Sequence, residues 1–161
     1  MKTAFRQSDI LKIFPWIKRR TLMSWSEIGL IQAEYGEAQG RRGVWRSYSY
    51  DNLLEIALIS EFTYSGIHHP RGGTATPHSV MLVIKKYRQA IREKAYDRIF
   101  MIGHVKKNGR FSIMFQDVSE AEFEGYETKV LFPPEWGMSS FTAISLRSLK
   151  EYVDQGIRGL V

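Results

Sequence analysis

Cysteine is absent from the 161 residues of this chain. The chain therefore has no disulfide framework, no thiolate metal site and no cysteine nucleophile. Long apolar runs are absent too, and none approaches the roughly 20 residues that a transmembrane helix needs. The first residues carry charges at Lys2 and Arg6, too early to leave room for the apolar core of a signal peptide. These absences predict a cytoplasmic protein without a membrane partner.

Catalytic motifs are missing as well. The sequence has no G-x-S-x-G, no P-loop and no pair of acids at a spacing typical of catalysis. His68 and His69 are adjacent, but no further ligand follows at a suitable spacing, so they make a poor zinc site. We therefore expect no enzymatic activity, no metal and no cofactor.

Acidic residues are scarce in the first part of the chain. Residues 1–96 contain 15 Lys and Arg against 8 Asp and Glu, a net charge of +7. Residues 97–161 contain 8 against 9, a net charge of −1. Charge alone favours nothing more than a solvated basic surface. Its uneven distribution suits a nucleic-acid-binding N-terminal domain joined to a neutral C-terminal domain.

Two short helices are predicted near the N-terminus. Ser8 is expected to cap the first one, and Pro15 to end it, because the residue before a proline is pushed out of the α region. The second helix should begin near Lys18 and run to about Ile28, just before Gly29. Helix, tight turn, helix is the outline of a helix-turn-helix unit, in which the second helix reads DNA.

A β-hairpin with a long tip is predicted for residues 31–49, which contain glycines and lack helical periodicity. Ser49 should then cap a third helix, with Asn52 as its capping-box partner. Gly66 is expected to end that helix.

Residues 68–76 are rich in proline and glycine and are predicted to be a linker. They would separate a DNA-binding domain at 1–67 from a second domain at 77–161. A helix is expected to restart at Pro77, and its apolar residues recur at the 4-3-4 spacing of an a/d seam. These residues are Val80, Ile84, Tyr87 and Ile91. The seam lasts roughly two heptads, which suits either a dimerisation helix or a helix packed on its own domain.

The rest of the chain predicts a small α+β domain with an antiparallel sheet. Strands are expected at 99–105, 111–115, 128–132 and 141–144, with a tight turn at Asn108-Gly109 and an acidic loop around Glu122. A last helix should end at Gly156. Trp136 and Met138 are candidates for the lining of an effector pocket, although plugging the edge of a small core suits them better.

Residues 8–66 resemble the DNA-binding domain of the MerR family of bacterial transcription regulators. The family pattern is T-L-R-Y-W-E-x-x-G-L-I, then a wing ending in Y-R-x-Y-S, then D-x-x-x-L-x-x-I. The matching residues are Thr21, Leu22, Trp25, Gly29, Leu30, Ile31, Trp45, Arg46, Ser47, Tyr48, Ser49 and Asp51, with Ile59 one position after the place of the last isoleucine. Met23, Ser24 and Ser26 stand where the family has Arg, Tyr and Glu, so one expected DNA contact is missing.

The resemblance implies a winged helix-turn-helix, a homodimer and binding to double-stranded DNA at a near-palindromic promoter element. Arg46 would hold a backbone phosphate, and Tyr48 would brace the strand beneath it. The remaining DNA-binding candidates are Lys18, Arg19 and Arg20 at the start of the second helix and Arg41 and Arg42 at the tip of the hairpin. RNA polymerase and a small-molecule or protein effector at the C-terminal domain are candidate partners, and the protein would be nucleoid-associated.

The sequence thus predicts a DNA-binding transcriptional regulator with an α+β fold: a winged helix-turn-helix, a helix and a small antiparallel-sheet domain. Two alternatives stay open. One is a protein-interaction adaptor whose winged helix no longer binds DNA, supported by the missing arginine. The other is an excisionase-like architectural protein that bends DNA without regulating a promoter.

Overall fold

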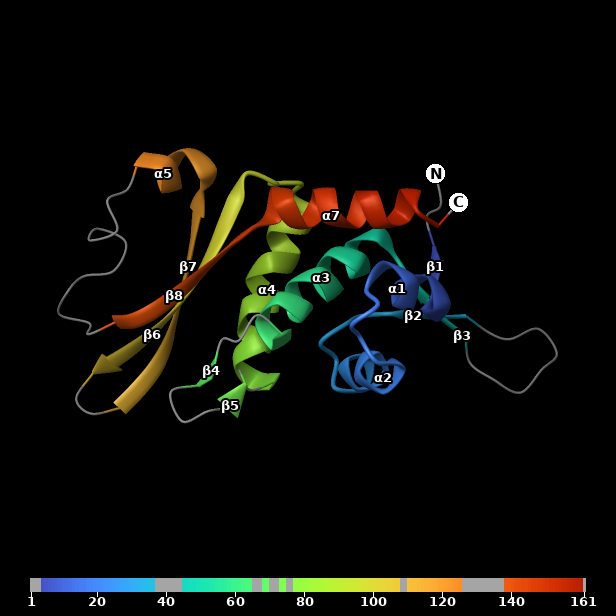
Figure 1. Ribbon diagram of the computed structural model, residues 1–161, viewed down its shortest axis with the longest axis horizontal. Coiled ribbons are helices and arrows are strands. Elements are labelled where there is room, and N and C mark those ends of the chain that lie inside the picture. Colours follow the sequence, from blue (N-terminus) through green and yellow to red (C-terminus); the bar gives the residue numbers. More distant parts are fainter. Residues whose placement is uncertain are drawn as a thin grey trace.

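The computed structural model describes residues 4–36, 45–64, 68–69, 73–74, 77–107, 110–125 and 138–160. Its fold is mixed α+β, as predicted, with helices packed around one central helix and a three-stranded sheet on one side (Figure 1).

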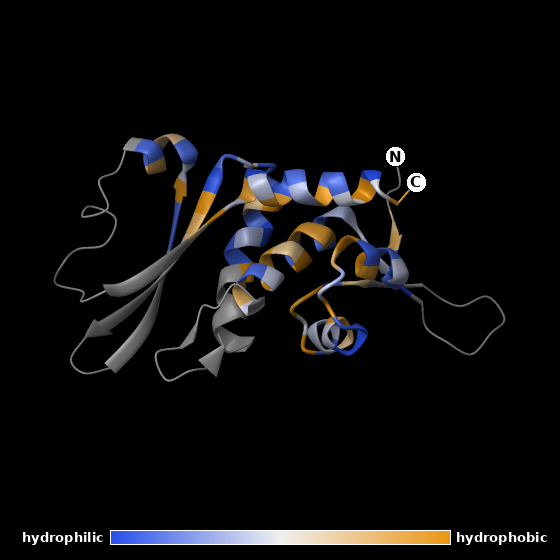
Figure 2. Ribbon diagram, viewed as in Figure 1, coloured by the Kyte–Doolittle hydropathy of each residue, from blue (hydrophilic) through white to orange (hydrophobic). Residues whose placement is uncertain are grey.

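The central helix, α3 (Tyr50–Tyr64), has no polar face (Figure 2). Every residue from 52 to 60 is buried, including the polar Asn52, Glu55 and Ser60. Its start follows the predicted capping box: Ser49 Oγ accepts from Asn52 N at 3.2 Å, and Asn52 Oδ1 accepts from Ser49 N at 3.0 Å. Helices α4 (Pro77–Arg92) and α7 (Leu146–Arg158) and strand β3 (Trp45–Tyr48) contact this helix.

The first helix, α1 (Gln7–Ile13), follows a short strand, β1 (Phe5–Arg6), that was not predicted from the sequence. Ser8 lies inside this helix, so its prediction as the cap was wrong. Instead Asp9 reaches back one turn, and its Oδ2 accepts from Arg6 N at 2.8 Å. The helix ends just before Pro15, as predicted.

The second helix, α2 (Arg19–Glu27), agrees with the predicted span to within one residue at each end. Leu22 and Trp25 are its buried anchors. The chain leaves it through Gly29, whose φ of +75° lies in the left-handed region that favours glycine. Leu30 N then donates to Trp25 O at 2.9 Å, which closes the last turn.

The predicted hairpin is confirmed in its two strands, β2 (Glu34–Gly36) and β3 (Trp45–Tyr48), which pair antiparallel. Its tip, residues 37–44, lies outside the described residues. Strand β1 pairs with the other edge of β3, with Phe5 opposite Tyr48. The three strands therefore lie in the order β1-β3-β2.

Two short strands, β4 (His68–His69) and β5 (Gly73–Thr74), pair within the predicted linker. Helix α4 (Pro77–Arg92) follows and packs against α3. The apolar seam of α4 is turned into the chain's own core, because Ile84, Tyr87 and Ile91 are at most 2% exposed. Tyr87 packs against Phe100 with ring centroids 4.7 Å apart. The seam therefore cannot be a dimer interface, and its use as one was a wrong alternative; the Val80 side chain lies outside the described residues.

The C-terminal sheet is antiparallel, in the order β7-β6-β8, from β6 (Arg98–Lys107), β7 (Arg110–Ser119) and β8 (Met138–Ser145). Lys107 pairs with Arg110, and these two residues lie on either side of the tight turn predicted at Asn108-Gly109. Asn108, Gly109, the predicted strand at 128–132 and Trp136 lie outside the described residues, as does the Met138 side chain.

The predicted acidic loop after β7 is wrong, because residues 120–125 form a helix, α5 (Glu120–Gly125). A capping box starts it: Ser119 N and Oγ both donate to Glu122 Oε2, and Ser119 Oγ accepts from Glu122 N. Phe123 of this helix covers Ile99, Met101 and Val118 on the sheet.

The last helix, α7 (Leu146–Arg158), begins at Ser145, whose Oγ accepts from Ser148 N at 3.2 Å. Gly156 lies inside the helix and does not end it, contrary to the prediction. The apolar side of α7 faces α3 (Figure 2), and the helix also packs against α1.

Buried side chains from both sides of residues 68–76 belong to one cluster, which runs from Phe5 to Val153. The two-domain boundary stays a prediction, but the two segments pack on each other in the structure.

Candidate nucleic-acid interface

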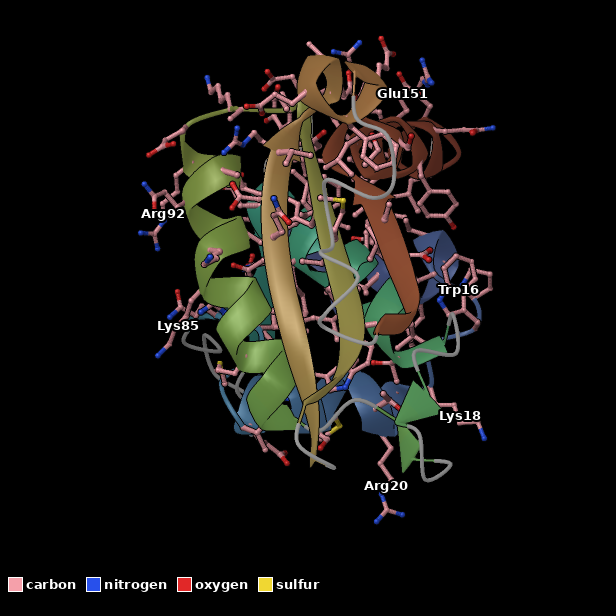
Figure 3. The ribbon with its side chains drawn as sticks, turned by 90° about the vertical axis from the view of Figure 1, so that its left-hand side faces the viewer. Trp16, Lys18, Arg20, Lys85, Arg92 and Glu151 are labelled. Atoms are coloured by element: carbon pink, nitrogen blue, oxygen red, sulfur yellow. The ribbon has the colours of Figure 1, made fainter. Side chains whose placement is uncertain are left out.

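Three consecutive cations, Lys18, Arg19 and Arg20, lie exposed at the start of α2. Leu22 and Trp25 fix the helix to the core, so the cations have a rigid base. Figure 3 shows the Lys18 and Arg20 side chains extending away from the body of the molecule. The structure thus brings together the three candidates that are adjacent in the sequence.

The position of these cations is electrostatically unfavourable for the helix itself. The N-terminus of a helix carries a partial positive charge, and a cation there costs about 0.3–1 kcal/mol at low ionic strength. The first turn of α2, which is described in full, has no acidic residue, and the Lys18 side chain makes no capping hydrogen bond. The side-chain cations and the free backbone N–H groups of this turn both attract an anion.

Arg46 lies on β3, opposite Tyr35 of β2. Its side chain is 20% exposed, and its Nη2 lies 3.7 Å from Oε1 of Glu27, which is 60% exposed. Arg46 therefore links the middle strand of the β1-β3-β2 sheet to the C-terminal end of α2.

Tyr48 is fully buried, with Phe5 as its partner across the sheet. The bracing role that the resemblance implies for this side chain stays a prediction. The side chain does not reach the molecular surface. Arg41 and Arg42 lie outside the described residues.

One polar network that was not predicted from the sequence holds the turn after α2. Arg88 of α4 donates from Nε to Glu55 Oε1 at 2.6 Å and from Nη2 to Leu30 O at 2.8 Å. Asn52 Nδ2 also lies 3.4 Å from Glu55 Oε2. In the sequence, Glu55 could have indicated this network, because a carboxylate within the apolar stretch of α3 must find a partner.

A second polar contact joins the start of α3 to α7. Tyr50 OH donates to Asp154 Oδ1 at 2.6 Å, and Lys150 Nζ lies 2.6 Å from Asp154 Oδ2. Burial, together with the bond to Asp154, raises the pKa of Tyr50. Burial acts to raise the pKa of Asp154 too, but hydrogen bonds from Lys150 and Tyr50 outweigh it and lower that pKa. Asp154 is therefore held in its charged form.

Within the described part of the chain, no three His, Asp or Glu side chains are grouped as a metal site would need. None of the helices described is both long and apolar enough to cross a membrane.

Comparison with known proteins finds no family model that matches the chain and no curated protein that matches it. A proposed function therefore rests on the residues of the chain and their geometry.

Proposed function

We propose that this chain is a sequence-specific DNA-binding transcriptional regulator of the MerR-like type. The order of elements supports this: α1 and α2 are joined by a tight turn, and an antiparallel hairpin and the buried helix α3 follow. A winged helix-turn-helix has this order, and it places the second helix in the major groove. The hairpin β2-β3 would then be the wing. The two-fold dimer and the near-palindromic promoter element come from the resemblance.

The observation that carries the proposal is the cluster of Lys18, Arg19 and Arg20 on the first turn of α2. These cations oppose the helix dipole and are exposed, so the folded chain gains little from them. Duplex phosphates would make these cations favourable, because the cations and the backbone N–H groups would point at the same anion.

The test is a titration of fluorescent duplex at several salt concentrations with the wild type and a variant. In the variant, Lys18→Ala, Arg19→Ala and Arg20→Ala are combined. The slope of log K against log salt should become less negative by about 0.9 for each phosphate that the variant no longer neutralises. The variant should be no less stable than the wild type, because the replaced cations oppose the dipole.

A matched control removes the same charge from α4. Lys85, Lys86 and Arg92 are exposed there, and Figure 3 shows Lys85 and Arg92 on a different edge of the molecule from Arg20. Their combined change to alanine should leave the salt slope almost unaltered. Equal slopes for the two triple variants would mean that net charge alone attracts DNA, and the proposed interface would be wrong.

One observation favours the adaptor alternative. Met23 of α2 and Ile28, which directly follows this helix, are 37% and 46% exposed, and Met23 stands where the family has a DNA-contacting arginine. Exposed apolar side chains on a reading helix suit a protein partner better than a base edge. In that case the wild type would bind duplex no better than the α2 triple variant at any salt concentration.

A further inference from the structure

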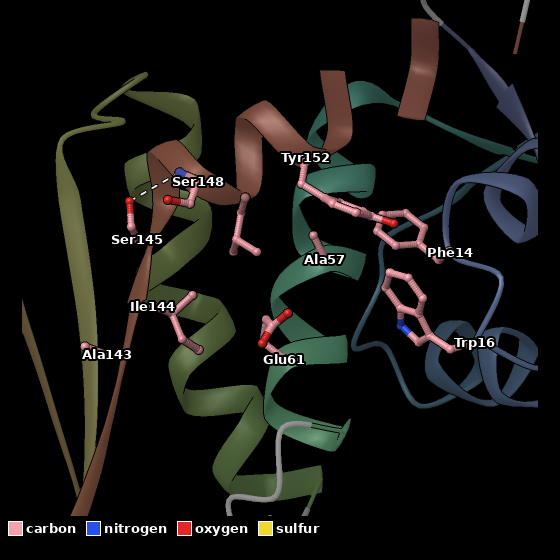
Figure 4. A pocket seen from close by; sticks show the side chains of 10 residues that line it. Phe14, Trp16, Ala57, Glu61, Ala143, Ile144, Ser145, Ser148 and Tyr152 are labelled. Carbon is pink, nitrogen blue, oxygen red and sulfur yellow. Dashed lines mark hydrogen bonds between the residues drawn. The ribbon is translucent and has the colours of Figure 1, made fainter. Parts of the chain in front are cut away.

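Two aromatic rings reach the surface together beside the turn between α1 and α2. Trp16 of this turn is 44% exposed, and Tyr152 of α7 is 37% exposed. Their ring centroids lie 5.7 Å apart. Phe14 packs against both, with its centroid 5.9 Å from each of the other two (Figure 4). We call Phe14, Trp16 and Tyr152 the aromatic cluster.

The aromatic cluster is held firmly in place. Tyr152 OH donates to Ile13 O at 2.7 Å, and Phe14 is fully buried. Ile17 N donates to Phe14 O at 3.0 Å, which closes the turn that carries Trp16. A surface ring that is already fixed loses little conformational freedom when a second ring stacks on it. The cluster is therefore a preformed platform for a flat aromatic group.

A pocket of about 420 Å³ opens beside this platform, and Trp16 and Tyr152 both help to line it. A flat group can therefore reach the rings from this side. None of the described residues that line the pocket is a lysine or an arginine. An anionic group attached to the flat one would have to find its cations outside the pocket.

Such cations follow Trp16 directly in the chain. Lys18 and Arg20 are both exposed. Lys18 comes two residues after Trp16, so their Cα atoms are at most about 7 Å apart. Figure 3 shows Trp16, Lys18 and Arg20 in this order along one edge of the molecule. Neither cation forms an ion pair with a residue that the structure describes. This edge therefore combines exposed rings with positive charge.

We propose that this edge binds single-stranded nucleic acid. An unpaired base would stack on Trp16, and the neighbouring phosphates would lie on Lys18 and Arg20. Proteins that bind single strands combine these two features, because aromatic rings hold the bases and cations hold the backbone. A duplex cannot use the ring in this way, since its bases are stacked on one another and present only their edges in the grooves. The partner is therefore a strand with unpaired bases.

This activity goes beyond the duplex binding proposed above. Lys18 and Arg20 belong to both interfaces, whereas Trp16 belongs to the single-strand site alone. Binding of a base to Trp16 requires neither a promoter element nor a second copy of the chain. Changes at Trp16 can therefore separate the two activities.

The first experiment compares two end-labelled strands that differ only in their bases. One is a strand of about ten deoxythymidines, a length within the site sizes of single-strand-binding proteins. The other has the same phosphates but an abasic sugar at every position. Fluorescence anisotropy measures the affinity of the wild type for each. The thymidine strand should bind at least about five times more tightly, because one stacked base contributes a factor of this size or more. Equal affinities would mean that only phosphates are bound, and would overturn the proposal.

A uridine strand of the same length distinguishes DNA from RNA as the source of the unpaired base. A preference for either base-bearing strand over its abasic counterpart supports the proposal if it depends on Trp16. The tighter of the two strands identifies the nucleic acid.

Salt separates the contribution of the phosphates from that of the base. The thymidine and abasic strands carry the same phosphates, so both affinities should fall with salt at the same slope and their ratio should stay constant. Lys18→Ala should make both slopes less negative by about 0.7 and leave the ratio unchanged. A ratio that fell to one as salt increased would show that the bases add nothing, and the stacking site would be wrong.

Variants then locate the base. Trp16→Leu should remove the preference for the thymidine strand and leave the affinities for the abasic strand and for duplex unchanged. Trp16→Phe keeps a ring and should retain part of the preference. The matched control is Ile28→Ala, which removes a similarly exposed apolar side chain just after the other end of α2. This control should leave all three affinities unchanged.

Two outcomes of this series would contradict the proposal. If Ile28→Ala acted like Trp16→Leu, the strand would be attracted by exposed apolar surface in general. If Trp16→Leu weakened duplex binding as much as single-strand binding, Trp16 would act by positioning α2 and not by stacking.

The two proposed activities can also fail separately. A wild type that binds no duplex but prefers the thymidine strand through Trp16 contradicts only the function proposed above. A wild type that binds duplex but binds the thymidine and abasic strands equally contradicts only the single-strand site.

Discussion

Arg88 Nε lies 2.6 Å from Glu55 Oε1, and the two side chains are 11% and 6% exposed. The pair joins α4 to α3, and the same guanidinium holds the carbonyl of Leu30 at the turn after α2. One buried arginine thus connects the segments before and after residues 68–76.

Removing one partner of this pair should destabilise the fold strongly. Arg88→Ala leaves Glu55 buried without its cation, and changes of this kind cost about 3–5 kcal/mol. Urea unfolding followed by circular dichroism would measure the decrease in the free energy of unfolding. The matched control is Arg147→Ala, whose ion pair with Glu120 is 56% and 25% exposed and should contribute less than about 1 kcal/mol.

A double variant separates charge from shape. Glu55→Leu combined with Arg88→Met replaces the pair by apolar side chains and should recover most of the stability that Arg88→Ala removes. If Arg88→Ala cost no more than Arg147→Ala, the network would not hold the two segments together.

Gly156 is required for the close approach of α7 to α1. A Cβ at this position would lie 2.7 Å from Ile13 Cγ2, a branched side chain that is 3% exposed. Gly156→Ala should therefore cost about 1–3 kcal/mol from overpacking, although alanine is the better helix former. Thermal unfolding checks the sign of the change.

The neighbouring glycine provides the control. A Cβ on Gly159 would meet nothing nearer than 3.5 Å, so Gly159→Ala should be neutral or slightly stabilising. In an Ile13→Ala background the cost of Gly156→Ala should shrink. A stabilising Gly156→Ala in the wild-type background would show that the two helices separate easily.

Elements with a local signal are predictable from the sequence. The capping box of Ser49, the stop at Pro15 and the turn at Gly29 depend on neighbours within four residues, and each is confirmed. The capping box of Ser119 has an equally local signal, but the run of glutamates after it is also typical of a solvated loop.

Contacts between distant segments are not predictable in this way. Gly156 has the same local signal whether it ends a helix or lets Ile13 approach, and only the packing decides. The pocket is formed by residues more than a hundred positions apart, such as Trp16 and Tyr152. At the proposed DNA interface, the cations of α2 are adjacent in the sequence and could be predicted, whereas the ion pair of Arg46 with Glu27 could not.

The buried seam of α4 provides a prediction that separates core from dimer interface. Ile84 is fully buried within the chain. Ile84→Lys should therefore unfold the protein or destabilise it by more than about 3 kcal/mol, because an unpaired charge would enter the core. A seam used for dimerisation would instead give a folded monomer. Light scattering and circular dichroism distinguish the two outcomes, and Lys85→Ala on the exposed side of the same helix should change neither.

Asp154 should make stability depend on pH in the acidic range. Its pKa in the folded state lies below the ordinary value of 3.8, so its contribution is present above that value and is lost as the pH falls through the folded-state pKa. The group is partly exposed, and we expect Asp154→Asn to cost at most about 1 kcal/mol at pH 7. The difference between variant and wild type should shrink as the pH falls through the folded-state pKa of Asp154.

Urea unfolding of both proteins at pH values from 7 down into the acidic range measures this difference, because the carboxylate loses its charge as the pH falls. Glu124→Gln, on the exposed surface of α5, serves as the control and should show no comparable difference at neutral pH. A difference between Asp154→Asn and the wild type that stayed constant down to the lowest pH would mean that the carboxylate charge does not matter there.

Glu27 and Arg46 provide the last prediction, which depends on the proposed DNA interface. Glu27 Oε1 lies 3.7 Å from Arg46 Nη2 and would compete with a phosphate for the guanidinium. Glu27→Gln removes that competition. It also removes a negative charge, whose repulsion of a phosphate at about 4 Å amounts to about 1 kcal/mol in water. Affinity should rise by a similar factor, about two- to five-fold, on specific and random duplex, because phosphate contacts carry no sequence information. Arg46→Ala should lower both affinities and make the salt slope less negative by about 0.9. Glu93→Gln, on the turn after α4, removes the same charge and serves as the control. If Glu27→Gln leaves the affinity for duplex unchanged, Arg46 lies outside the interface.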